Sequence, residues 1–328
     1  MTSLSKQRGV ALILVLMVVA IITSVGIFSS SHLLSFSKFT NDLANRQQAQ
    51  WYAIGVESTA SNFLEQRLKE KKRSVVIADY DLPVIKVSLG TANIEATLRD
   101  LNSCFNVNSL IKKIPTEDKY IINQGGIDQY KDLLKVLNFS NFEMEGLVYS
   151  LVDWMDSDIF YSNTYGAEDD HYVRNDYPYR TANQPISILD EIYSIKNYSK
   201  EIMEILSPYL CALPEVGSTA ININAISKDK PALLAMLFGE NLSITSAKNI
   251  LHSRPEGGFL DTKEFLSHPE LEGIVVSKIT KSQLKVSSRF YLLETKVYTN
   301  DYPYYLQSLL NLDDNGLVKI LSRRLGVF

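Results

Sequence analysis

Residues 10–28 have the sequence VALILVLMVVAIITSVGIF, a run of nineteen residues without a charged side chain. As an α-helix rising about 1.5 Å per residue, this run covers about 28 Å, close to the roughly 30 Å thickness of a bilayer's hydrocarbon core. Lys6 and Arg8 precede the run, and positive charge is retained on the cytoplasmic side of a membrane. We therefore expect a single-pass anchor with its N-terminus in the cytoplasm and residues 29–328 across the membrane.

The sequence that follows favours continuation of the same helix into the soluble part. The first proline is Pro83, and apolar or small residues recur at the spacings of three and four that are typical of a helix with one buried face. A helix over residues 10–72 would be about 95 Å long, with 10–28 in the membrane and 29–72 packed on a globular head. The alternative is a cleavable secretory signal, but such signals have apolar segments of about 7 to 15 residues and an A-x-A-like site. This sequence has a longer run and lacks the site. The positions that carry the spacing are Ala49, Ala53, Val56, Ala60, Phe63, Leu64 and Leu68.

Composition limits the remaining possibilities. The chain has 328 residues, 45% of them hydrophobic, and a formal net charge of -4, which is a globular composition long enough for two cores. An acidic chain has no electrostatic reason to approach a phosphate backbone, so we expect no nucleic-acid partner. Cys104 and Cys211 are the only cysteines, too few for a four-cysteine zinc site, and they are either buried thiols or one disulfide.

Strand patterns at both ends of the soluble region predict an antiparallel sheet. Between them, residues 101–285 have a mostly helical pattern and the size of a domain. The predicted fold class is α+β, with a long N-terminal helix, a sheet built from 73–100 and 286–328, and a large α-helical insertion over 101–285. The predicted strands are a hairpin, 84–89 and 93–100, and three later strands, 287–299, 304–312 and 317–321, the last two joined by an Asp-Asp-Asn-Gly turn.

Two patterns occur inside the insertion. Residues 243–267 predict a helix, a Pro-Glu-Gly-Gly turn and a second helix, similar to a helix-hairpin-helix or SAM-like element. Such elements contact DNA in some proteins, but behind a membrane anchor in an acidic chain we expect packing instead. A weak repeat relates FNVNSL (105–110) to ININAI (221–226). We interpret each as an extended segment in which Asn108 or Asn224 caps the following helix.

The segment 152–179, VDWMDSDIFYSNTYGAEDDHYVRNDYPY, is strongly acidic. Between Asp153 and Asp176 it contains seven carboxylates and one cation, Arg174. Seven like charges over so short a span either stay solvated in an exposed loop or are organised by a hard cation. Calcium accepts about six to eight oxygen ligands in flexible geometry, which suits this loop better than the stricter octahedron of magnesium. The spacing is not that of an EF-hand.

No pattern typical of catalysis is present. G-x-S-x-G, H-E-x-x-H and phosphate-loop motifs are missing, and the four histidines are scattered. We therefore expect a protein that is not an enzyme.

The N-terminus resembles that of type IV pilins and type II secretion pseudopilins. A short basic leader ends in Gly9, and the apolar helix begins at Val10. The resemblance implies that a prepilin peptidase cuts after Gly9 and methylates Val10. Most members carry glutamate at mature position five, where this chain has Leu14. The K-type minor pseudopilin, placed first at the filament tip, is the member that lacks this glutamate.

Several strings are similar to the K-type pseudopilin pattern and cover most of the chain: RDLNSCFNVNSL, VDWMDSD, GAEDDHY, PYRTANQPISILDEI, YLCALP, AININA and SRPEGGF. This resemblance implies a pilin-like sheet and a calcium ion in the helical insertion. The carboxylate candidates for that ion are Asp153, Asp156, Asp158, Glu168, Asp169 and Asp176. Asp153 and Asp156 can alternatively cap a helix, and Asp170 can face solvent. The resemblance also favours a disulfide between Cys104 and Cys211 over two thiols.

The resemblance further implies a tip subunit that helps start pseudopilus growth and supports protein export across the outer membrane. It places the anchor in the inner membrane and the head in the periplasm. The implied partners are the I-type and J-type minor pseudopilins, the major pseudopilin, the prepilin peptidase and the inner-membrane assembly platform. Two alternatives stay open: a minor pilin of a type IV pilus, and a membrane-anchored periplasmic calcium-dependent enzyme or lectin.

Overall fold

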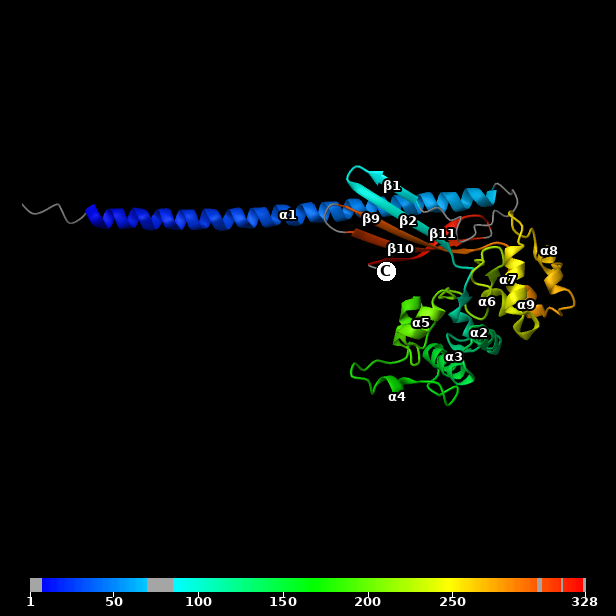
Figure 1. Cartoon of the computed structure of the whole chain (residues 1–328). Coiled ribbons are helices and arrows are strands. Elements are labelled where there is room, and N and C mark those ends of the chain that lie inside the picture. The colour runs from blue at the N-terminus through cyan, green and yellow to red at the C-terminus, as the bar shows by residue number, and fades with distance from the viewer. Residues whose placement is uncertain (1–7, 70–84, 300–302, 314, 327–328) are drawn as a thin grey trace, which may run out of the picture.

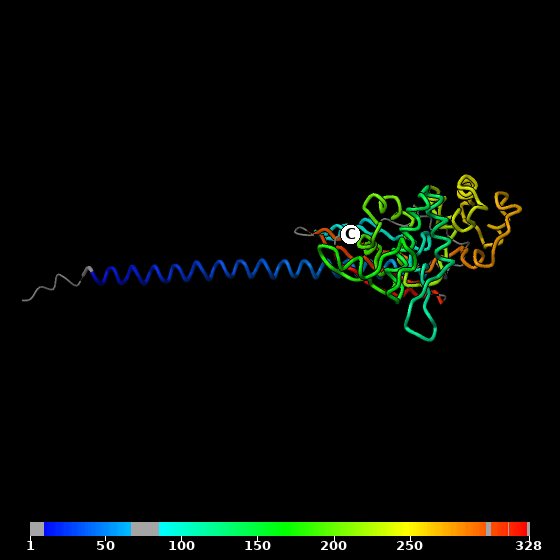
Figure 2. The backbone as a smooth tube through the Cα atoms, turned by 90° about the horizontal axis from the view of Figure 1, so that it is seen from below, coloured from blue at the N-terminus to red at the C-terminus, as the bar shows by residue number. Residues whose placement is uncertain are grey.

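A single long helix dominates the computed structural model of the chain, which describes residues 8–69, 85–299, 303–313 and 315–326. This helix, α1 (Arg8–Lys69), runs unbroken from the apolar run into the head (Figure 1). It is the one helix in the described residues that is long and apolar enough to cross a membrane. Its N-terminal half leaves the head as a free stem (Figure 2). The predicted continuous helix is confirmed over the described part of residues 10–72, and residues 70–72 of that prediction lie outside the described residues.

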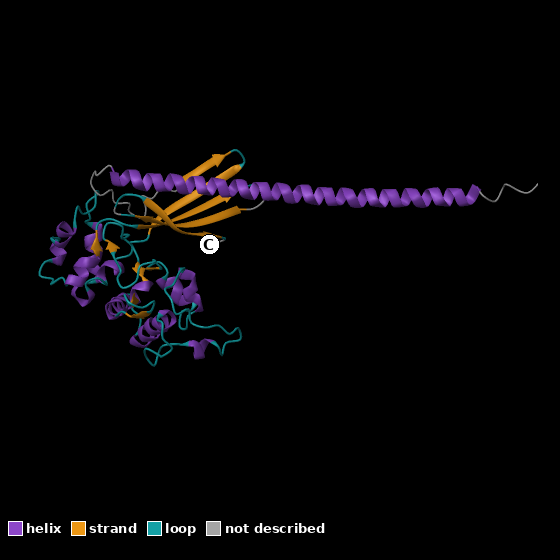
Figure 3. Cartoon of the chain, turned by 180° about the vertical axis from the view of Figure 1, so that it is seen from behind, coloured by secondary structure: helices purple, strands orange, loops and turns teal. Residues whose placement is uncertain are grey.

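The C-terminal half of α1 lies across one face of a five-stranded antiparallel sheet (Figure 3). Ala49, Ala53, Ala60 and Leu64 are buried against the strands. The three alanines let the helix approach the sheet closely. The strands alternate buried and half-exposed residues, as expected for a sheet with one covered face. The strand order is β1 (Ile85–Leu89), β2 (Ala92–Asp100), β9 (Phe290–Tyr298), β10 (Pro303–Leu312) and β11 (Val318–Leu325).

One buried charge joins α1 to the last two strands. The Glu57 side chain is 2% exposed, and its carboxylate accepts hydrogen bonds from Nε and Nη2 of Arg323 at 2.9 and 2.8 Å and from the Ser308 hydroxyl at 2.6 Å. Burial alone raises the pKa of Glu57, but the hydrogen bonds from Arg323 and Ser308 bring that pKa below its ordinary value. The carboxylate is therefore ionised and fully paired inside the head.

Replacing Arg323 with methionine is expected to lower the free energy of unfolding by about 2–3 kcal/mol, because it leaves the Glu57 carboxylate buried without its cation. The loss stays below that of a fully buried pair because half of the Arg323 side chain is exposed. The double variant Glu57→Gln/Arg323→Met should recover part of the loss. Urea unfolding of the full chain in detergent measures these values. Lys86→Met, which removes an exposed pair with Glu95, is the matched control and should cost less than about 1 kcal/mol. If Arg323→Met and the lysine control lowered the free energy of unfolding equally, burial of the Glu57 carboxylate would not be the cause.

The insertion lies between β2 and β9 and forms its own large core, which includes Phe105, Tyr130, Leu147 and Phe265. Its helices and short strands follow one another along the chain as β3 (Phe105–Asn106), η1 (Val107–Leu110), β4 (Ile111–Lys113), β5 (Tyr120–Ile122), α2 (Gln124–Val136), α3 (Asn141–Met155), α4 (Asp169–Tyr172), η2 (Leu189–Ser194), α5 (Lys200–Leu206), β6 (Leu210–Cys211), β7 (Ile221–Asn222), α6 (Ala232–Ala235), η3 (Gly239–Asn241), α7 (Ile244–His252), α8 (Thr262–Leu266), η4 (Pro269–Leu271), α9 (Lys278–Gln283) and β8 (Leu284–Lys285).

The two asparagine segments make the same contacts in two halves of the insertion. The side-chain amide of Asn108 donates hydrogen bonds to the carbonyls of Ile186 and Leu213 and accepts one from the backbone N–H of Ile186, at 2.7–2.8 Å. In the same way, the side-chain amide of Asn224 donates to the carbonyls of Phe259 and Val286 and accepts from the backbone N–H of Phe259. Each segment also starts a two-residue parallel pairing, β3 with β6 and β7 with β8.

The prediction that Asn108 and Asn224 cap a following helix is wrong. The residue that caps η1 is Asn106, whose side chain accepts from the backbone N–H of Asn108. Asn108 is fully buried, and its amide is needed to satisfy backbone groups that have no ladder partner. The sequence pattern located the repeat but not the burial that decides which role the asparagine takes.

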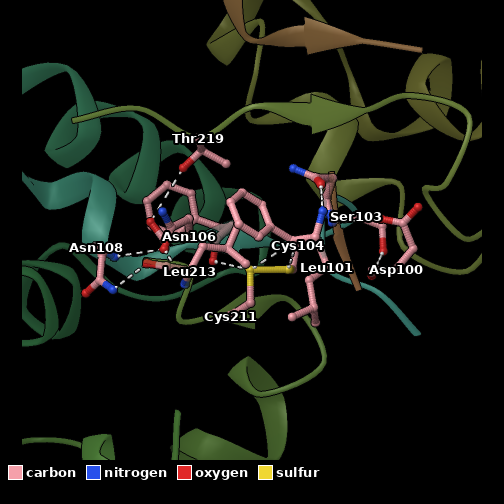
Figure 4. Close-up of a disulfide and its surroundings, with 12 residues drawn as sticks. Asp100, Leu101, Ser103, Cys104, Asn106, Asn108, Cys211, Leu213 and Thr219 are labelled. Atoms are coloured by element: carbon pink, nitrogen blue, oxygen red, sulfur yellow. Dashed lines mark hydrogen bonds between the residues drawn. A yellow bond between two sulfur atoms is a disulfide. The ribbon is translucent and has the colours of Figure 1, made fainter. Parts of the chain in front are cut away.

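The two cysteines lie together at the junction of the insertion and the sheet (Figure 4). Cys104 and Cys211 form a disulfide with their Cα atoms 5.8 Å apart. They pack in a small apolar cluster with Leu213 and Phe290, the first residue of β9. The disulfide therefore closes the first half of the insertion at the point where that half meets the sheet.

Several predicted segments coincide with structural elements only in part. Residues 1–7 of the leader and 70–84, which include the start of the 73–100 segment, lie outside the described residues. The sheet resumes at Phe290 and not at 286–287, because residues 286–289 connect the insertion to the strand. The helix-hairpin-helix pattern corresponds to α7 and α8, and in its turn the Phe259 N–H donates to Asn224. This hairpin packs inside the insertion.

Candidate metal centre

The acidic segment begins where α3 ends. A capping box formed by Ser140 and Glu143 starts this helix, and its apolar residues enter the core of the insertion. Asp153 lies in its last turn and Asp156 is its C-terminal cap residue. The chain then makes a loop and returns through Gly166 to Glu168, directly before α4. Asp153 and Asp156 therefore do not cap a helix N-terminus, and their side chains are available to the loop.

Three carboxylates meet at this return. One oxygen from each of Asp156, Asp158 and Glu168 lies within 4.8 Å of the others. Asp153 is next to the group, since its charge acts on both Asp156 and Glu168. A Cβ on Gly166 would lie 1.9 Å from Asp153 Oδ2, so any larger residue there would force a shift of this carboxylate or of the chain. Asp153, Asp156 and Glu168 are 2% exposed or less. Four of their oxygens are buried without a hydrogen-bond partner, namely Asp153 Oδ2, Asp156 Oδ1 and both Glu168 oxygens.

The other oxygens of the group are held by the loop. Asp153 Oδ1 accepts from the backbone N–H of Ser162 at 2.9 Å, and Asp158 Oδ1 accepts from that of Phe160 at 2.8 Å. The Ser162 hydroxyl donates to Asp156 Oδ2 at 3.4 Å. Each aspartate thus has one oxygen fixed by the loop and one left for another partner. Ser162 was missed by sequence reasoning, since only the folded loop brings it to these carboxylates.

The electrostatics of the group are unfavourable without a cation. Burial, together with the neighbouring carboxylates, raises the pKa of Asp156 to about 7 and that of Glu168 to about 8. Burial also raises the pKa of Asp153. Carboxylate oxygens that are close together and buried without hydrogen-bond partners are a donor set suited to a hard divalent cation. The residues present therefore fit calcium, which Asp156, Asp158 and Glu168 would hold together with the neighbouring Asp153.

The structure does not bring the predicted ligands Asp169 and Asp176 into this group, nor Asp170, which was predicted to face solvent. Asp169 accepts from the backbone N–H and hydroxyl of Thr181, both at 2.9 Å, and faces Arg180. Asp170 accepts from the Tyr161 hydroxyl and pairs with Arg174 at 3.3 Å. Asp176 is exposed. Spacing in the sequence could not separate these residues from the group, because the separation depends on where α3 ends and on the return of the chain at Gly166.

The N-terminal residues predicted for processing lie in the first turn of α1. The helix begins at Arg8, so Gly9 and Val10 are helical, and Leu14 is an exposed residue of the apolar stem. Nothing in the described head contacts this part of the helix, which is 0% buried over its apolar window.

Comparison with known proteins identifies the family. Two family models, both described as type II secretion system protein K, match residues 103–215 and 221–287. A protein of Aeromonas hydrophila named type II secretion system protein K is 32% identical over 272 residues, with 80% of each chain covered. The chain belongs to the type II secretion system protein K family. A protein K of Pectobacterium carotovorum is 28% identical over 98% of this chain and 97% of its own length.

A solved structure extends this similarity to the fold. A chain of the GspK–GspI–GspJ complex from enterotoxigenic Escherichia coli matches with a TM-score of 0.75 and 27% identity, over 88% of this chain and 99% of that chain. Membership of the protein K family, the stem helix and the antiparallel sheet together make the chain a minor pseudopilin of a type II secretion system. The predicted K-type resemblance and fold class are confirmed. The boundary between the two family models falls between the two halves of the insertion described above.

Proposed function

We propose that this protein K is the subunit at the tip of the pseudopilus, where it helps start assembly and so supports protein export across the outer membrane. The observation that carries the proposal is the insertion of residues 101–289 between neighbouring strands β2 and β9. A head enlarged in this way projects sideways from the axis of α1, beside the sheet (Figure 1). Such a head is difficult to repeat in a tight helical stack, but it is accommodated where no subunit lies beyond it. The role is one of assembly, without a catalytic step.

The proposal includes the topology and partners of the subunit. The stem anchors it in the inner membrane with the head in the periplasm, as the basic residues before the apolar run favour. The GspK–GspI–GspJ complex supports the I-type and J-type minor pseudopilins as partners. The major pseudopilin, the prepilin peptidase and the assembly platform complete the set. A tip subunit has no subunit ahead of it, so Leu14 in place of an acidic residue avoids an unpaired carboxylate in an apolar bundle.

Calcium is part of the proposed function. Bound by Asp153, Asp156, Asp158 and Glu168, the ion would supply positive charge to four carboxylates that otherwise repel one another. These residues and the loop that donates to them would then form one rigid segment of the head. The support is the set of buried carboxylate oxygens without a partner.

Processing at Gly9 tests the proposal. In cells that contain the prepilin peptidase, we expect the membrane-bound protein to begin at methylated Val10, because the leader ends in Gly9 and the apolar helix follows at once. Intact mass and N-terminal sequencing of the purified full chain measure this. A chain beginning near Ser31, or an uncut Met1, would contradict the pseudopilin assignment of the stem. Unchanged protein export after deletion of the subunit would contradict the secretion role separately.

A further inference from the structure

The loop that returns to the carboxylate group carries large apolar side chains on its outer side. Ile159 and Phe160 are 67% and 75% exposed. They follow directly after Asp158, one of the three converging carboxylates. A soluble head exposes such side chains at a free energy cost unless they are covered in an assembly.

The backbone holds this pair outward. The Phe160 N–H donates to Asp158 and the Ser162 N–H donates to Asp153, at 2.8 and 2.9 Å. The next residue, Tyr161, donates its hydroxyl to Asp170, which joins the loop to α4. On the other side, the Ser157 N–H donates to the Tyr120 carbonyl at 3.0 Å, which joins the loop to β5. Ile159 and Phe160 are therefore presented by a fixed backbone and do not fold back into the core.

The segment that carries the pair, residues 152–179, is negatively charged. Asp158, Asp170 and Asp176 are exposed in the same segment, and its single cation, Arg174, pairs with Asp170. Calcium at the carboxylate group would offset only part of this charge. The chemistry that complements the pair is an apolar patch rimmed by lysine and arginine on a folded protein, since opposite charges around an apolar contact favour the correct encounter.

The position of the loop selects the partner. Along the axis of α1, the α4 region lies on the side of the insertion that faces the stem, whereas α8 lies at the far end (Figures 1 and 2). The head of a subunit packed beside the stem, nearer the membrane, would approach the insertion from the side that carries α4. A protein that approaches from beyond the tip would instead meet the α8 side first.

We propose that Ile159 and Phe160 are a docking site for the head of a neighbouring pseudopilin subunit, which covers them with an apolar patch rimmed by basic residues. This inference rests on the proposed tip position and assigns a contact surface within it. The carboxylate group acts as a positioning element, because it fixes the backbone from which the two apolar side chains project.

Site-specific photo-crosslinking tests the contact. A photoreactive phenylalanine replaces Phe160 in the full-length chain, in membranes that contain all the pseudopilins. Val275, which is 91% exposed between η4 and α9, is the matched control position on the insertion. Phe36, exposed on the stem, reports whether the chain assembles at all. We expect position 160 to give a crosslink to the head of another pseudopilin and position 275 to give none.

The outcomes separate the two proposals. Crosslinks from position 36 without a pseudopilin crosslink from position 160 would overturn the docking site and leave the tip role intact. A crosslink from 160 to an exported protein or an outer-membrane component would overturn it as well. Absence of crosslinks at both position 36 and position 160 would overturn the docking site together with the proposed function.

Affinity measurements add a second readout. Phe160→Ser should weaken the complex with detergent-solubilised partner pseudopilins by about tenfold or more, because a central aromatic contact is lost. Val275→Ser should leave this affinity unchanged. Titration with calcium chloride alone should give the same calcium affinity for both variants and the parent. Parental partner affinity in Phe160→Ser would overturn the proposal.

Discussion

Replacing Cys104 and Cys211 with serine is expected to lower the free energy of unfolding by about 4–5 kcal/mol, the stabilisation that loop-closure entropy gives a cross-link of this span. The two cysteines are 107 residues apart in sequence and buried at the junction of the insertion and the sheet. Without the bond, the conformational entropy of the unfolded first half of the insertion increases. In the folded state, two serine hydroxyl groups are placed in the apolar cluster at Phe290. Denaturant unfolding of the oxidised full chain in detergent, compared with the double variant, measures the loss.

Reduction provides the control for this prediction. The parent chain in excess reductant should unfold at nearly the same denaturant concentration as the double serine variant, which separates the loss of the bond from the effect of the serine side chains. The serine variant should show no response to reductant. A loss below about 1 kcal/mol in both experiments would mean that packing at Leu213 and Phe290 holds the junction without the bond.

The stem and the sheet could be predicted from the sequence because their signals are local. A run of nineteen uncharged residues and a spacing of three and four specify a helix without reference to any partner. The alternation in 93–100 specifies a strand with one covered face in the same way. Errors occur only at the ends, as at Phe290, where the transition from the insertion to the strand depends on contacts with Asn102 that the local pattern does not contain.

The insertion could be predicted only in outline. Its helical character and its repeat are visible in the sequence, but the role of Asn108 depends on Ile186 and Leu213, which are 78 and 105 residues away. A side chain amide that bridges two distant backbones has the same local sequence as one that caps a helix. The choice between the two roles is made by tertiary burial.

The candidate site was predictable as a segment and not as a set of ligands. Seven carboxylates identify the region, yet only Asp156, Asp158 and Glu168 converge, with Asp153 beside them, and the other three face elsewhere. The physical reason is the geometry of the return at Gly166, which places Glu168 beside Asp156, while Asp169, one residue later, faces Thr181. Adjacent residues at the start of α4 thus point to different sides, a distinction that composition does not carry.

Replacing Asp156 with asparagine or Glu168 with glutamine is expected to change stability in opposite directions with and without calcium. In chelator at a pH above 8, where both side chains are ionised, each variant should be more stable than the parent by about 1 kcal/mol or more, because one of several buried like charges is removed. In calcium, the parent should gain about 2.7 kcal/mol at a concentration one hundred times its dissociation constant. Each variant should lose most of this gain because a charged ligand of the ion is missing. Thermal unfolding of the full chain in detergent, in calcium and in chelator, measures both signs.

The carboxylates outside the group supply the matched controls. Asp176→Asn and Asp170→Asn each remove one negative charge from the same segment without touching the group, so their calcium response should equal that of the parent.

Gly166→Ala keeps every carboxylate but places a Cβ 1.9 Å from Asp153 Oδ2. It should therefore weaken calcium binding by about tenfold or more, whereas Gly125→Ala, where the nearest atom is 3.9 Å away, should not. If Asp176→Asn lost as much calcium response as Asp156→Asn, the ion would be held by the general acidity of the loop. The opposite signs in calcium and chelator arise only if the ion is held by the buried group, because only there does removal of a charge relieve repulsion.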